Sequence, residues 1–179
     1  MPKVDNDETK KTAKPFLIIA QKRSGGTYLT HCLSNHPRIF CDRGESMHHL
    51  SVWRKHFEAF EVLHVLTHQE GYHASGFRMV YAQAFNKQLW PLVRDVLKPR
   101  VIWLTRDNVL RCGISICINR MIRMKELPYH PVHSFKYKEP PRFTVDPQRI
   151  LAACHKVRNS NKTAGKRLAL SGLDYLHLT

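Results

Sequence analysis

The sequence is poor in acidic residues, has few cysteines and contains no long apolar run. Fourteen Asp and Glu stand against 29 Lys and Arg, which gives a formal net charge of +15. This excess favours anionic partners such as nucleic acid, acidic membrane surfaces or small molecules that carry phosphate or sulfate. Charge alone does not choose among these partners.

The five cysteines are odd in number and include no CxxC pair. A disulfide framework or a four-thiolate zinc site is therefore not expected, and the pattern indicates a reducing compartment. No window approaches the ~18 apolar residues of a membrane span, and the polar N-terminus lacks the apolar core of a secretory signal. We expect a cytoplasmic protein with a disordered tail over residues 1–14 and a single domain over residues 15–179.

Short apolar runs alternate with stretches of helical periodicity. This alternation favours an α/β fold, a mostly parallel sheet flanked by helices. Residues 126–147 are rich in Pro, His and Tyr without periodicity, so we expect a long loop or lid there. The expected strands are 16–20, 39–41, 76–81, 101–105 and 175–178, and the expected helices are 27–33, 46–66, 83–97, 108–124 and 148–170. The predicted apolar face of helix 108–124 comprises Leu110, Ile114, Cys117, Ile118 and Met121.

The turn after the first strand has the composition of an anion site. A strand, a Gly-containing turn and a helix start together present backbone N–H groups and a positive dipole end to an anion. Gly25 and Gly26 allow close backbone approach, and hydroxyls and cations surround them in the stretch KRSGGTYL, residues 22–29. An ordinary turn without a ligand fits this stretch equally well.

The turn is neither a Walker A loop, since no Lys precedes Thr27, nor a GxGxxG loop. It resembles instead the 5′-phosphosulfate loop of the sulfotransferases that use 3′-phosphoadenosine 5′-phosphosulfate (PAPS), in particular its RSGSTLL-like form. Gly26 stands where that family commonly has a small hydroxyl residue or Gly.

A second stretch, VIWLTRDNVLRCGIS at residues 101–115, resembles the family's other signature. In that signature a strand is followed by an Arg and, one or two helical turns later, a Ser. Here Arg106 and Ser115 are 115 − 106 = 9 positions apart, and the resemblance implies that they bind the 3′-phosphate. An Arg offers a planar fork suited to phosphate, and Arg111 could contribute from its i,i+4 position.

Weaker resemblances to the trehalose-type bacterial members lie in IFCDRGE (residues 39–45) and GFRMVYAQ (residues 76–83). Together the resemblances cover most of residues 15–125. The chain ends just after the expected strand 175–178, which continues in longer members, so we expect a member shortened at its C-terminus.

The family resemblance implies a P-loop nucleotide-kinase-like fold. It also implies in-line sulfuryl transfer from PAPS to a carbohydrate or small-metabolite hydroxyl, which leaves 3′-phosphoadenosine 5′-phosphate (PAP) as product and requires no metal. Arg23 occupies the position of the family's catalytic cation, and Lys22 is its rival. Glu45 is the first candidate for the base, with His48 or His49 as the alternative. The residues implied in holding the 5′-phosphosulfate are Arg23, Ser24, Gly25, Gly26, Thr27 and Tyr28.

Two alternative functions remain open. The basic stretch HKVRNSNKTAGKR at residues 155–167 could follow a nucleic-acid backbone, although no nucleic-acid-binding signature accompanies it. An inactive member that only binds PAP or PAPS is the other. His64 and His68 have the i,i+4 spacing of a zinc pair but lack a third ligand in the sequence, so we do not expect a metal site.

Overall fold

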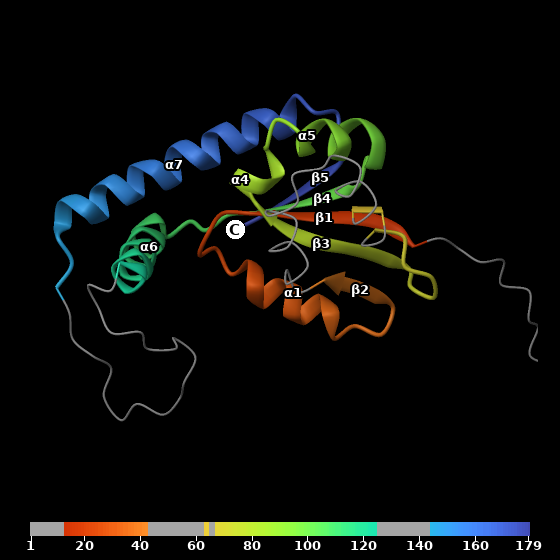
Figure 1. The fold of residues 1–179 in the computed structure, drawn as a ribbon, viewed down its shortest axis with the longest axis horizontal. Coiled ribbons are helices and arrows are strands. Elements are labelled where there is room, and N and C mark those ends of the chain that lie inside the picture. Colours follow the sequence, from red (N-terminus) through yellow and green to blue (C-terminus); the bar gives the residue numbers. More distant parts are fainter. Residues whose placement is uncertain (1–12, 43–62, 65–66, 125–143) are drawn as a thin grey trace, which may run out of the picture.

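A computed structural model describes residues 13–42, 63–64, 67–124 and 144–179. Within these ranges the strands form one sheet in the order β2-β3-β1-β4-β5, and every neighbouring pair is parallel. The prediction of a parallel α/β sheet flanked by helices is confirmed (Figure 1). The strands are β1 (Lys14–Ala20), β2 (Ile39–Asp42), β3 (Ala74–Val80), β4 (Arg100–Leu104) and β5 (Tyr175–Leu178).

Several predicted features lie outside the described residues. These are most of the tail, nearly all of the expected helix 46–66, the greater part of the segment 126–147, and the candidate bases Glu45, His48 and His49.

The central strand β1 is buried on both faces of the sheet, as its unbroken apolar run predicts. Leu17 and Ile19 belong to one core cluster and Phe16, Ile18 and Ala20 to the other. Because side chains alternate along a strand, this single run supplies both layers. Helix α1 (Gly26–Ser34) lies on one side of the sheet, and helix α7 (Pro147–Ala169) spans the other (Figure 1).

The prediction of a single helix over residues 83–97 was wrong. The chain forms the short helices α4 (Tyr81–Ala84) and α5 (Leu89–Pro91), which continues into a π-helix, η1 (Leu92–Leu97). Asn86 competes with helical bonding, because its side-chain oxygen accepts from the Gln88 N–H at 2.8 Å. Periodicity did not reveal this break.

Helix α6 (Val109–Arg123) forms where the sequence predicted a helix, but its buried face differs. Leu110 is 57% exposed, whereas Cys112, Gly113 and Cys117 are buried. The small residues allow α7 to approach closely: a Cβ on Gly113 would lie 2.6 Å from Cys154 Sγ. The contact between α6 and α7, rather than the apolar stripe, decides which side of α6 is buried.

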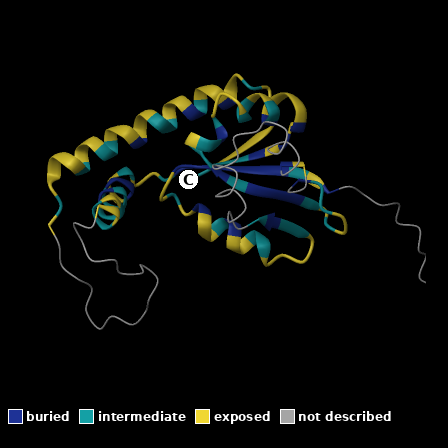
Figure 2. Cartoon of the chain, in the orientation of Figure 1, coloured by how far each residue is buried: buried dark blue, intermediate teal, exposed yellow. Residues whose placement is uncertain are grey.

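Helix α7 begins where the expected loop 126–147 ends. The Asp146 side chain accepts from the Gln148 N–H at 2.9 Å, and Pro147 occupies the first turn, both common at helix starts. The 23 residues of α7 include no Asp or Glu. Along most of α7, the residues that face away from the sheet are exposed (Figure 2).

No helix in the described segments combines the length and apolar character needed to cross a bilayer.

Candidate anion-binding site

The strand register brings the two predicted phosphate motifs together. Ala20, the last residue of β1, pairs with Leu104, the last residue of β4. The loops that follow these adjacent strands therefore begin at the same level, and Gln21 N–H still donates to Leu104 O at 3.1 Å. β1 is connected to β2 through α1 on one side of the sheet, whereas the connection from β4 to β5 includes α7 on the other side (Figure 1). Such a switch point is where ligands bind in open α/β sheets.

Arg23 is the centre of the contacts between the loops. Its Nε donates to the Ser115 hydroxyl at 2.6 Å, and its backbone carbonyl accepts from Arg106 Nη1 at 3.3 Å. The Cys112 thiol also lies 3.7 Å from that carbonyl. The family resemblance implies that Arg106 and Ser115 bind a separate phosphate, and here both also contact Arg23 directly.

The backbone of this loop is left-handed at two residues. Arg23 has φ of 69° and Gly25 has φ of 94°. Gly adopts this region freely, but for an Arg it carries strain of about 1 kcal/mol or more. Of the five N–H groups of the Arg23 guanidinium, one is bonded to Ser115, so the others can meet a ligand.

The N-terminus of α1 has no side-chain cap and no acidic residue in its first turn. Its first N–H groups have no partners within the helix and present a partial positive charge. Arg78 of β3 passes beneath this turn and donates to Thr27 Oγ1 at 3.2 Å. A Cβ on Gly26 would lie 2.9 Å from Arg78 Cδ, so Gly26 leaves the room that Arg78 occupies.

These residues line a cleft of about 600 Å³ at the carboxyl edge of the sheet, which we refer to as the anion cleft. None of its described lining residues is Asp or Glu, and six of the fourteen are cationic. Burial lowers the pKa of Arg78 below the usual value of a guanidinium, although the group remains charged near neutral pH. The six cations are Lys22, Arg23, Arg78, Arg106, Arg120 and Arg123.

Sequence reasoning missed three of these cations. Arg78 is the one charged residue of β3, which was the available signal. Arg120 and Arg123 lie on α6 beyond Ser115, together with Asn119. Helical spacing from Ser115 could have identified Asn119 and Arg123, since residues four and eight positions apart share a helix face.

The remaining predicted residues differ in where they lie. Lys22, Gly25, Thr27 and Tyr28 line the cleft, and the Tyr28 side chain is 76% exposed. Ser24 is not part of the lining, because its hydroxyl donates to Gln21 O at 2.7 Å and closes the turn.

Within the described residues, no group of three or more His, Cys, Asp or Glu could hold a metal ion. The His64 and His68 rings stack at 4.0 Å, and His68 Nδ1 lies 2.9 Å from Thr67 Oγ1. All five cysteines are free thiols.

The fold and the cleft define a class: a parallel α/β protein with a cationic cleft at the carboxyl ends of its central strands, whose described lining residues include no Asp or Glu. Comparison of the chain with protein-family models, with curated proteins and with solved structures finds no match in any of the three.

Proposed function

We propose that this protein transfers a sulfuryl group from PAPS to an acceptor hydroxyl. The observation that carries the proposal is the convergence of Arg23, Arg106 and Ser115 beside the uncapped N-terminus of α1. The family resemblance implies these residues for a bisphosphate nucleotide, and their proximity is not a property of the sequence alone. A P-loop nucleotide-kinase-like fold is part of the same proposal.

The residues present suit an anionic nucleotide. The cleft concentrates positive charge without a neutralising carboxylate among its described lining residues, and it has the size of a small-ligand pocket. Backbone N–H groups of Gly26, Thr27 and Tyr28 would hold the 5′ group, with Arg23 and Lys22 beside them. Ser115 accepts from Arg23, so its own O–H is free to donate to the ligand.

PAPS supplies the SO3 group: its bond to the 5′-phosphate oxygen breaks, the acceptor oxygen bonds to sulfur and releases a proton to a base, and PAP leaves. Arg23 or Lys22 places positive charge where negative charge develops on the departing oxygen, which stabilises the transition state more than the ground state. Glu45 is the base that the family resemblance implies, with His48 or His49 as the alternative.

A second candidate, nucleic-acid binding, has one specific observation in its favour. Arg158, Lys162 and Lys166 recur at helical spacing along the exposed part of α7, which carries no acidic residue. Such a face suits a phosphate backbone. It lacks the aromatic residues that usually stack on exposed bases, so we rank it second.

The test is calorimetric titration of PAP into the wild-type protein and an Arg23→Ala/Arg106→Ala variant. Hydrogen bonds to charged groups contribute about 1.5–3 kcal/mol each, so losing two should weaken binding by at least ~100-fold. An Arg38→Ala/Arg100→Ala variant is the control. It removes the same charge at the amino ends of β2 and β4, the opposite edge of the sheet.

One-to-one binding that is lost only in the first variant supports the proposal. Equal losses in both variants would instead indicate a general effect of charge. Turnover of PAPS to PAP with a sulfated product separates an enzyme from an inactive member that only binds. Binding of oligonucleotides with a steep salt dependence, and none of PAP, would favour the second candidate.

A further inference from the structure

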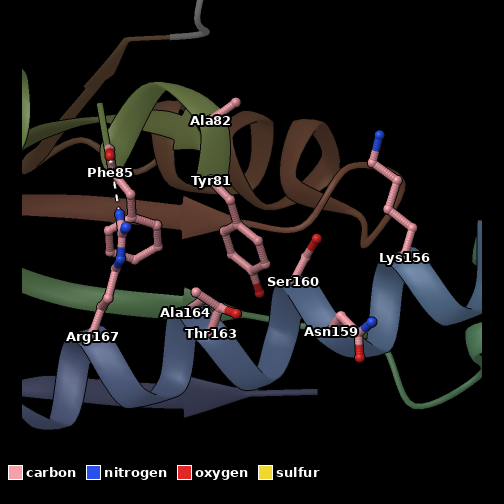
Figure 3. A pocket seen from close by; sticks show the side chains of 9 residues that line it. All are labelled: Tyr81, Ala82, Phe85, Lys156, Asn159, Ser160, Thr163, Ala164 and Arg167. Carbon is pink, nitrogen blue, oxygen red and sulfur yellow. Dashed lines mark hydrogen bonds between the residues drawn. The ribbon is translucent and has the colours of Figure 1, made fainter. Parts of the chain in front are cut away.

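A second hollow lies between α4 and the middle of α7, on the side of the sheet away from α1. Its volume is about 690 Å³, within the range of small-ligand sites. Tyr81, Ala82 and Phe85 form one wall, and side chains of α7 form the other (Figure 3). We refer to this hollow as the α4–α7 groove.

The α7 wall presents cations and hydrogen-bonding groups at a regular spacing. Lys156, Asn159, Thr163 and Arg167 follow one another at intervals of three or four residues, so they share one helix face. From Lys156 to Arg167 this face extends roughly 16 Å, given 1.5 Å per residue. The described lining of the groove contains no Asp or Glu.

The opposite wall is aromatic and fixed in place. Tyr81 OH accepts from Trp103 Nε1 at 2.8 Å and bonds to Asn161 Oδ1 at 3.0 Å. Arg167 lies 5.3 Å from the centroid of the Phe85 ring and donates to Phe85 O at 3.1 Å. These contacts hold a ring and a guanidinium at one end of the groove before any ligand arrives.

Lys156, at the other end, makes no ion pair with a described residue. In Figure 3 the groove follows the direction of the strands, and Lys156 lies toward their carboxyl ends. Val80 lines the anion cleft and the next residue, Tyr81, lines the groove. The groove therefore leads away from the anion cleft, with Lys156 nearer to it than Arg167.

We infer that the α4–α7 groove binds the acceptor, and that the acceptor is an elongated carbohydrate carrying negative charge. This inference rests on the proposed function. Hydroxyl and amide groups suit the hydroxyls of sugars, aromatic rings suit their apolar faces, and the two cations, without described acidic neighbours, select an anionic chain over a neutral one. A neutral acceptor would leave both cations without a counter-charge.

The test is titration of tetragalacturonate, an acidic tetrasaccharide, into the full chain with and without saturating PAP. Maltotetraose serves as the neutral probe and oligothymidylate as the nucleic-acid probe. Lys156→Gln should weaken tetragalacturonate binding by up to about fivefold, the upper end for an exposed ion pair. Thr163→Phe, which fills the groove from an exposed helix position, should abolish it. Lys162→Gln is the matched control on the same helix outside the groove, and it should change nothing.

Four results would overturn the inference: no binding of tetragalacturonate, equal binding of maltotetraose, no effect of Thr163→Phe, or equal effects of Lys156→Gln and Lys162→Gln. Tighter binding of oligothymidylate through the same residues would also overturn it, in favour of nucleic acid. The PAP affinity is measured separately in each variant and should not change. A protein that binds PAP but not the sugar refutes the groove alone, and one that binds the sugar but not PAP refutes the proposed nucleotide.

Discussion

The hydroxyl of Tyr81 joins α7 to the sheet, and we predict that removing it destabilises the fold. It contacts Trp103 of β4 and Asn161 of α7, residues far apart in the sequence. Tyr81→Phe keeps the ring and its contacts but leaves the indole N–H and the amide oxygen without this partner. Each buried group left unsatisfied costs about 1–3 kcal/mol.

Because Tyr81, Trp103 and Asn161 are half-buried rather than fully buried, water can replace part of the loss. We therefore expect the free energy of unfolding to fall by about 2 kcal/mol, the lower end of the combined cost of two unsatisfied groups. With a urea slope of about 2 kcal/mol/M, the unfolding midpoint should fall by roughly 1 M while the slope stays constant. Circular dichroism during urea unfolding measures both quantities.

Tyr72→Phe is the matched control. Its hydroxyl makes no hydrogen bond with a described residue, although its ring lies 5.7 Å from that of Phe40. We expect its unfolding free energy to change by less than about 0.5 kcal/mol. If Tyr81→Phe and Tyr72→Phe behaved alike, the reasoning about the hydrogen bonds would be refuted.

The same hydroxyl predicts a pH dependence. Burial raises the pKa of Tyr81 from 10.0 to about 12, and the hydrogen bond from Trp103 offsets part of this rise. Since the folded protein favours the neutral phenol, its stabilisation is complete below pH 10 and is lost as the pH rises from 10 toward 12. The stability difference between wild type and Tyr81→Phe should therefore shrink over this window, as urea unfolding at several pH values would measure.

Two further predictions concern packing and thiols. Gly76→Ala should lower the free energy of unfolding by about 3 kcal/mol, because the new Cβ would meet the Phe16 carbonyl oxygen and lie 2.7 Å from Phe16 Cγ. A urea unfolding midpoint like that of wild type would contradict the β1–β3 register. Cys32 is exposed, whereas burial raises the pKa of Cys41 to about 12. A thiol reagent near neutral pH should thus show one fast phase that Cys32→Ser removes, and a fast phase that survives this substitution would count against the assignment.

Much of the fold could be predicted from the sequence because its signals are local. The apolar run of β1 and the β-branched and aromatic residues of β4 identified buried strands, and their alternation with helices identified a parallel sheet. The break after α4 could not be read from periodicity, since it depends on a single Asn side chain bonding to the backbone. The buried side of α6 depends on how closely α7 approaches, which is a tertiary property.

The same division applies to the anion site. The sequence by itself determined the residue types at each strand end: the Gly turn with its cations after β1, and Arg106 with Ser115 after β4. Only the tertiary structure decided that these two loops meet at Arg23, because the register of β1 with β4 places their ends at one level. It also brought Arg78, Arg120 and Arg123 to the same cleft, since charges distant in the chain become neighbours only when strands pair and helices pack.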